Sequence, residues 1–220
     1  MGRERRFIAD AAHEMRTPLA VLKVHAENLK DAASEDDRRA SLEHLMAGVD
    51  RTTRLVNQLL TMARIEPRTS ALEAPKTDLV ATVRDSLVQM TPWLLSKELE
   101  LVFDPVDEVG LVKVDTGIIQ IALNNLVSNA ANFSPPGGLI TVGLAKHHDH
   151  YELSVEDQGP GIDEAERDRL FERFYSRGND HGAGLGLTIV QSIANRLGGQ
   201  VRLENRPSGG LRATFEFARL

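Results

Sequence analysis

The stretch DAAHEMRTPLAVLK, residues 10–23, places a histidine, a glutamate and a proline inside an otherwise helical apolar pattern. A neutral imidazole is a good nucleophile near neutral pH, and Glu14 beside His13 can accept a proton from the ring. Pro18 is expensive in this setting, because a proline inside a helix costs about 3 kcal/mol. A kink at Pro18, close to a candidate nucleophile, predicts a distortion of the helix that serves function. The alternative is that His13 and Glu14 are an ordinary surface histidine and glutamate.

Asparagines recur in NNLVSNAANFSPPGG, residues 124–138, although asparagine is a mediocre helix former. Asn125 and Asn129 are one helical turn apart and therefore share a face of the expected helix. Amide oxygens are hard ligands that suit Mg²⁺ held jointly with substrate phosphates. The alternative is that these asparagines only line the polar face of a helix.

The segment DQGPGID, residues 157–163, follows an expected strand. Gly159 and Gly161 allow the backbone to approach a flat ligand closely. A buried Asp157 carboxylate would accept a hydrogen bond from an exocyclic amine such as that of adenine. A simple β-turn that begins with aspartate is the competing interpretation.

A second glycine segment, GAGLGLTIV at residues 182–190, precedes a strongly predicted helix. Gly182, Gly184 and Gly186 would present bare amides to an anion, and the helix dipole adds to the attraction. Because no strand comes immediately before it and no Lys-Ser/Thr pair follows, it is neither a dinucleotide fingerprint nor a P-loop. The intervening FERFYSRGNDHG, with Arg173 and Arg177, predicts a mobile lid over phosphates.

Two long helices must carry the histidine stretch, because apolar residues recur there at alternating steps of three and four. The stripes are Ile8, Ala11, Met15, Leu19, Leu22, Ala26 and Leu29, then Leu42, Leu45, Val49, Thr52, Val56, Leu59 and Ala63. Ser34 followed by Asp37 resembles a capping box for the second helix. The short AASEDD connection makes the helices antiparallel, and a hairpin that cannot enclose both stripes favours a dimeric four-helix bundle. Packing of the hairpin on the rest of its own chain is the alternative.

The remaining chain predicts an α+β domain, a sheet with helices on one face. Two prolines mark a linker, which gives domains at residues 1–66 and 78–220 joined by residues 67–77. Helices are expected at 79–97, 115–133 and 184–199, and strands at 99–104, 139–147, 151–157, 200–206 and 211–217. Trp93, the only tryptophan, is expected in the core of this domain. His147, His148 and His150 cluster at a hairpin tip, where the linear sequence offers no carboxylate or cysteine of fitting spacing for a metal.

The composition excludes several classes of protein. A net charge of −6 argues against nucleic-acid binding, and the absence of cysteine excludes disulfides, thiolate zinc sites and cysteine nucleophiles. No apolar run approaches the ~20 residues of a membrane span. The composition suits a reducing cytoplasm, and the start of the chain looks like that of a piece cut from something longer.

The motifs taken in series resemble those of bacterial sensor histidine kinases, over nearly the whole chain. HEMRTP looks like their H box, NNLVSNAANFS like the N box, and FERFY like the F box between the glycine boxes DQGPGI and GAGLGL. The stretch RRFIADAAHEMRTPLAVLK further resembles kinases paired with regulators of the OmpR type, the QseC and PmrB group. The resemblance implies a homodimeric helical hairpin joined to an α/β sandwich of the Bergerat ATP-binding type. It also implies that this is a cytoplasmic domain, without membrane contact of its own, of a bacterial inner-membrane protein.

The resemblance also implies roles for individual residues. His13 would be phosphorylated, Glu14 would orient its ring and take its proton, and Thr17 would help dephosphorylate a partner regulator. Asn129 would bind Mg²⁺, and Asp157 would bind the adenine amino group. The implied ATP-binding set is Asn125, Asn129, Phe133, Asp157, Gly159, Gly161, Arg173, Arg177, Gly182, Gly184, Gly186 and Leu187. Asn132 departs from the family, which often has a basic residue there, and Arg173 or Arg177 would have to substitute.

The implied activity is ATP-dependent phosphorylation of His13, followed by transfer to an aspartate of a response-regulator receiver domain. Two alternatives stay open. One is a catalytically degenerate dimeric scaffold that binds a regulator, and the other is a different ATPase of the same nucleotide fold. The histidine-bearing hairpin at residues 3–63 argues against the second, because chaperone, topoisomerase and mismatch-repair ATPases lack it.

Overall fold

A computed structural model describes residues 2–65, 75–105, 109–175 and 184–219. The chain divides into two compact units, Met1–Arg64 and Ile65–Leu220, which are described separately. None of the helices in the described ranges is long and apolar enough to cross a bilayer.

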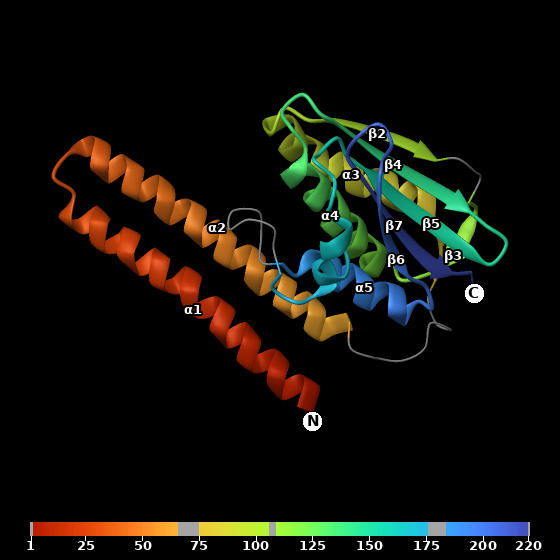
Figure 1. Ribbon diagram of the computed structural model, residues 1–220, viewed down its shortest axis with the longest axis horizontal. Helices are drawn as coiled ribbons and strands as arrows, with labels where there is room; N and C mark the ends of the chain where they lie inside the picture. Colours follow the sequence, from red (N-terminus) through yellow and green to blue (C-terminus); the bar gives the residue numbers. More distant parts are fainter. Residues whose placement is uncertain (1, 66–74, 106–108, 176–183, 220) are drawn as a thin grey trace. The chain divides into compact units, whose positions relative to one another are not determined.

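The first unit is the predicted helical hairpin, α1 (Gly2–Asp31) and α2 (Glu35–Ile65), which run antiparallel (Figure 1). The capping box is confirmed: the Ser34 hydroxyl accepts from the Asp37 amide at 3.1 Å and donates to the Asp37 carboxylate at 2.6 Å. Pro18 lies inside α1, which continues through it. A Cβ added to Gly48 would lie 2.7 Å from Leu22, so this glycine lets α2 approach α1 closely.

The hairpin leaves large apolar side chains exposed on both of its helices. They are Leu19, Val21, Val24, Leu42, Met46, Val49 and Leu60. Exposed apolar residues scattered singly are normal, but Leu42, Met46 and Val49 follow helical spacing and form one patch on α2. The hairpin by itself therefore does not fully enclose the stripes that its sequence predicts.

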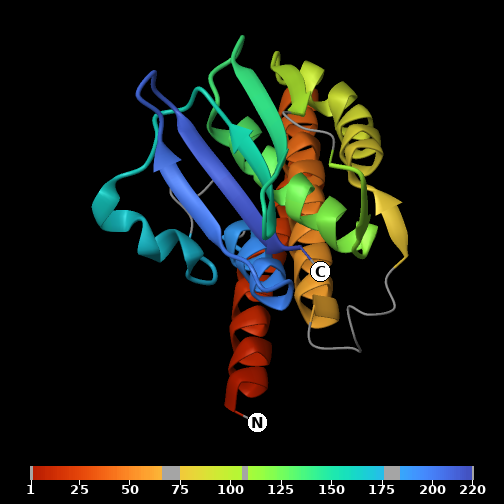
Figure 2. The same ribbon diagram turned by 90° about the vertical axis from the view of Figure 1, so that its right-hand side faces the viewer.

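The second unit is a five-stranded mixed sheet in the order β2-β4-β5-β7-β6, with three helices on one face (Figures 1 and 2). Its strands are β2 (Glu100–Pro105), β4 (Leu139–Lys146), β5 (His150–Glu156), β6 (Val201–Asn205) and β7 (Leu211–Ala218). Strand β2 is parallel to β4, and the other pairs are antiparallel. The helices are α3 (Leu79–Ser96), α4 (Thr116–Phe133) and α5 (Gly186–Arg196). The predicted sheet with helices on one face is confirmed.

Two short strands lie outside that sheet. Strand β1 (Lys76–Asp78) pairs antiparallel with β3 (Leu111–Lys113), so the end of the expected linker is a strand. Three residues are too few to show an alternating pattern, which explains why the sequence did not indicate them. Two 3₁₀ turns, η2 (Glu164–Glu166) and η3 (Asp168–Phe171), follow the first glycine segment.

The core lies between the sheet and its helices. Leu123 of α4, Ile189 of α5, Leu153 of β5 and Phe215 of β7 are among the side chains with no exposed surface. The prediction that Trp93 lies in this core is wrong, because its side chain is 38% exposed. The Lys97 ammonium lies 5.4 Å from the centre of its ring, a cation–π distance that suits a partly solvated indole.

Candidate functional site

A buried carboxylate stands where β5 ends. Asp157 is only 6% exposed, and its Oδ1 accepts hydrogen bonds from the backbone amides of Gly159 at 2.8 Å and Leu211 at 3.0 Å. These two donors fix the orientation of the carboxyl group. No described residue donates a hydrogen bond to the other oxygen, Oδ2, and this atom is not fully enclosed by the protein. It can therefore accept a hydrogen bond from a ligand.

Burial raises the pKa of Asp157 above its ordinary value. The amides of Gly159 and Leu211 and the charge of Arg206 oppose this shift, and burial outweighs them. Because the ionised form is poorly solvated, a ligand that donates a hydrogen bond to Oδ2 recovers part of the lost solvation. This is the environment expected for a carboxylate that recognises an amino group.

Gly159 brings the loop after β5 against the end of α4. A Cβ at this position would lie 2.8 Å from the backbone oxygen of Phe133, so no other residue fits without a backbone shift. Gly161 has φ +70°, and a Cβ there would lie 2.6 Å from Asn205 Oδ1. The Asn205 side chain in turn accepts from the amide of Ile162 and donates to its carbonyl. The first glycine segment is thus held on both sides, and the backbone of Phe133 lies at the same corner.

The two asparagines of α4 meet the second glycine segment at the start of α5. A Cβ on Gly186 would lie 3.2 Å from Asn125 Oδ1 and 3.3 Å from Asn129 Oδ1, so both amides face this helix end. Asn124 is exposed, which confirms that the second asparagine of the pair has the inward register. The Asn125 amide nitrogen donates to Ile121 O at 2.8 Å, so its oxygen points away from its own helix. Amide oxygens beside a helix N-terminus suit a hard cation shared with phosphate oxygens.

The aromatic segment docks on the start of α5 through its backbone. Gly184 has φ +66°, and a Cβ there would lie 2.5 Å from the carbonyl carbon of Phe174. The Phe174 amide donates to Gly184 O at 3.0 Å, and the Thr188 hydroxyl donates to Phe171 O at 3.0 Å. Leu187, on the first turn of α5, is half-buried.

Sequence reasoning missed two residues that hold the Asp157 backbone. The Arg206 guanidinium donates to Asp157 O at 2.7 Å and pairs with Glu156 at 3.1 Å. Gly210, at φ +92°, passes so close that an added Cβ would lie 2.0 Å from Asp157 O. The only signal was the glycine pair in PSGG, which indicated a hairpin turn and nothing about a site some 50 residues earlier.

The two turn glycines give a matched pair for testing this contact. We expect Gly210→Ala to lower the free energy of unfolding by at least about 3 kcal/mol, and Gly209→Ala by only about 1–2 kcal/mol. Both residues have positive φ, but a Cβ on Gly209 would meet nothing within 4 Å. Urea unfolding of the two variants would measure the difference, and equal losses would contradict a steric role for Gly210.

A lysine at the end of another helix lies beside Asn132. Lys97, the C-cap of α3, places its ammonium 3.4 Å from Asn132 Oδ1. Asn132 stands where the resemblance implies a basic residue. The sequence could not indicate this contact, because it depends on how α3 packs beside α4.

The remaining predicted residues are placed only in part. His13 and Glu14 lie in the α1 helix, and the structure does not describe their side chains. Thr17 is exposed on the same helix, and Arg173 is exposed in the aromatic segment. Arg177 and Gly182 lie outside the described residues. The structure thus brings Asp157, Gly159 and Phe133 together, and separately the asparagines with Gly186.

Comparison with known proteins assigns both units to described families. Residues 3–68 match the model "His Kinase A (phospho-acceptor) domain" and residues 114–220 match "Histidine kinase-, DNA gyrase B-, and HSP90-like ATPase". The chain is 34% identical to the swarming motility regulation sensor protein RssA of Serratia marcescens, over 91% of this chain and 43% of that protein. It is also 34% identical to the sensor protein QseC of Escherichia coli K12, over 97% of this chain and 47% of that protein. The chain therefore spans less than half the length of these relatives.

The fold likeness extends to a solved structure of comparable length. The Acinetobacter baumannii histidine kinase AdeS superposes with a TM-score of 0.75 at 26% identity. The match covers 94% of this chain and 98% of that one.

Proposed function

Because the chain belongs to the sensor histidine kinases of two-component systems, we propose that it phosphorylates itself on His13 with ATP and passes the phosphoryl group to an aspartate of a response-regulator receiver domain. The observation that carries this proposal is the buried Asp157, with one oxygen fixed by two backbone amides and the other available to a ligand. Two further features support it: the glycine segment after β5 lies beside this carboxylate, and the paired asparagines of α4 lie at the start of α5.

The second unit binds the nucleotide. Asp157 Oδ2 accepts a hydrogen bond from the adenine amino group, with Phe133, Gly159 and Gly161 shaping the base pocket. The amides at Gly184 and Gly186 and the positive end of α5 attract the phosphates. Lys97 adds positive charge near Asn132. Arg173 and Leu187 also belong to the proposed nucleotide-binding residues. Arg177 and Gly182 are included from the sequence alone.

Mg²⁺ fits the asparagine face of α4. Asn129, with Asn125 one turn away, would hold it through an amide oxygen, and both oxygens lie near Gly186 as this chemistry requires. When bound, the ion neutralises charge that develops on the phosphate oxygens during transfer. The asparagines themselves act by fixing where the phosphates lie.

The hairpin supplies the nucleophile. A ring nitrogen of His13 attacks the γ-phosphorus in line, the bond to the bridging oxygen of ADP breaks, and the ring proton passes to Glu14. The chain would also act as a phosphatase of the regulator, in which Thr17 helps a water molecule to remove the phosphoryl group. Pro18 removes one helical hydrogen bond and so lets α1 bend near His13. The domain bounds 1–66, 67–77 and 78–220 belong to this proposal.

We further propose that two hairpins associate into a four-helix bundle through the exposed apolar patch of α2. Light scattering should then give about twice the chain mass of 24.2 kDa. The double change Met46→Glu and Val49→Glu should return the mass to that of one chain. The two new carboxylates are solvated in the single chain, whereas the dimer would bury them at a cost in free energy. Arg39→Glu, which changes the net charge equally at an 81% exposed side chain, should leave the mass unchanged. A single-chain mass for the unmodified protein would contradict the bundle.

The catalytic proposal is tested by incubating the 220-residue chain with Mg²⁺ and ATP labelled in the γ-phosphate. The expected product is protein-bound label that survives alkali and is lost in acid, as a phosphoryl–nitrogen bond requires. Chelation of Mg²⁺ should prevent labelling. A degenerate scaffold would bind ATP without labelling, and an acid-stable label would place the phosphate on a hydroxyl group.

A further inference from the structure

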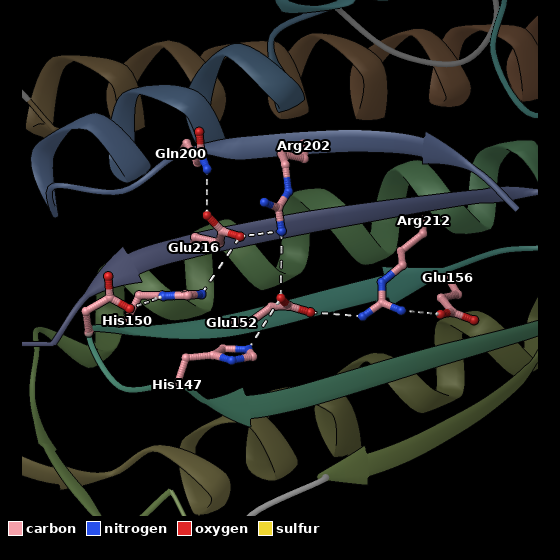
Figure 3. Close-up of polar contacts among 9 residues, drawn as sticks. His147, His150, Glu152, Glu156, Gln200, Arg202, Arg212 and Glu216 are labelled. Atoms are coloured by element: carbon pink, nitrogen blue, oxygen red, sulfur yellow. Dashed lines mark hydrogen bonds and ion pairs between the residues drawn. The ribbon is translucent and has the colours of Figure 1, made fainter.

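Two histidines face each other at the tip of the β4–β5 hairpin, on the face of the sheet that carries no helix (Figure 3). His147 and His150 flank a two-residue turn, and the His147 amide donates to His150 O at 2.8 Å. Their rings stack with centroids 4.4 Å apart. The turn therefore places two imidazoles side by side.

The sheet adds a carboxylate that the linear sequence did not indicate. Glu152 of β5 places Oε2 3.6 Å from His147 Nε2. One ligand atom from each of His147, His150 and Glu152 lies within 4.8 Å of the others. Among the described residues, no other group of three histidine, cysteine or acidic side chains comes this close together.

Neighbouring side chains orient two of these three ligands, His150 and Glu152. Asp149 Oδ1 lies 2.8 Å from His150 Nδ1, which places the ring proton on Nδ1 and leaves Nε2 as the electron-pair donor. Arg212 donates to Glu152 Oε1 at 2.9 Å, whereas Oε2 lies 3.6 Å from His147 Nε2 and 3.9 Å from the Arg202 guanidinium, too far for a hydrogen bond to Arg202. A carboxylate behind a histidine and a held carboxylate are the supports that bound metal ions have in proteins.

A second carboxylate closes the site on the β7 side. Glu216 is 9% exposed at its side chain, and its Oε1 lies 3.9 Å from His150 Nε2. Its oxygens are already engaged, with Arg202 on Oε1 at 2.5 Å and Gln200 on Oε2 at 2.8 Å. Glu216 therefore adds negative charge behind the histidines but is not itself an available ligand.

We propose that His147, His150 and Glu152 bind a divalent transition-metal ion of the Zn²⁺ class. Imidazole nitrogens with one carboxylate oxygen suit Zn²⁺, and three protein ligands leave a fourth position for water. The ion would join the hairpin tip to the body of β5. This site lies within the second unit on described residues and does not depend on the proposed kinase activity.

The test is calorimetric titration of the metal-stripped chain with ZnCl₂. We expect about one equivalent to bind, with an increase in the thermal midpoint, because the ion binds only the folded hairpin. The change His147→Ala with His150→Ala should weaken this binding at least about tenfold, and Glu152→Gln should weaken it too. The histidines are partly exposed, so their removal leaves the core intact, which circular dichroism would verify.

A second stacked pair provides the matched control. His25 and His44 of the hairpin have ring centroids 5.0 Å apart but no third ligand within reach among the described residues. The change His25→Ala with His44→Ala should leave Zn²⁺ binding unaltered. Amide NMR signals should shift on Zn²⁺ addition around residues 146–153. The proposal is overturned if the His147/His150 variant binds as the unmodified chain does, or if the shifts fall elsewhere.

Discussion

Replacing His13 with glutamine is expected to reduce phosphoryl incorporation from labelled ATP to background, a loss of more than about 1,000-fold. Glutamine keeps the size and hydrogen-bonding capacity of the side chain, but its amide nitrogen is not a nucleophile. The measurement is the autophosphorylation assay described above, with the modified residue mapped on the unmodified chain.

His25→Gln is the matched control, because it removes a histidine from the same helix twelve residues away. This variant should label as the unmodified chain does. ATP affinity of His13→Gln should be unchanged, since the proposed nucleotide residues all belong to the second unit. Persistent labelling of His13→Gln would show that another side chain accepts the phosphoryl group.

Asp157→Asn is expected to weaken ATP binding about 100-fold, equivalent to about 2.7 kcal/mol, while the fold is kept. The asparagine oxygen can still accept from the amides of Gly159 and Leu211, so the loop stays in place. Its NH₂ group then occupies the position of Oδ2 and faces the amino group of adenine. Both groups donate hydrogen bonds, so the contact is lost. Fluorescent-nucleotide titration would measure the loss, and unchanged affinity would exclude Asp157 as the adenine contact.

The same variant tests the raised pKa of Asp157. A carboxyl group with a raised folded pKa contributes stability below its unfolded pKa of about 3.8, and that contribution is lost as pH rises through the folded pKa. Asparagine does not titrate. The urea midpoint of Asp157→Asn relative to the unmodified chain should therefore increase from pH 4 toward neutrality. A difference that shrinks over this range would contradict burial as the dominant influence on this carboxyl group.

Most elements of the fold could be predicted from local pattern. The predicted helices and strands of the second unit lie within three residues of those observed, because each carries its own apolar periodicity or cap. Asp78 and Asp115 cap α3 and α4 by accepting from Ala81 and Gly117, as an aspartate before an apolar run indicates. Trp93 was misplaced because its assignment to the core rested on residue type, whereas the structure leaves it outside the buried positions of α3.

The sequence by itself determined the elements, the order of the motifs and the types of residue available for chemistry, because helical and strand periods and glycine conformations are local properties. Only the tertiary structure decided which side chains meet. Pairing of β5 with β7 sets Leu211 and Gly210 against Asp157, and the fold of the β4–β5 hairpin sets Glu152 beside His147. Lys97 reaches Asn132 only because α3 packs on α4. Such contacts depend on strand register and helix packing between distant segments, and no local pattern in the chain records them.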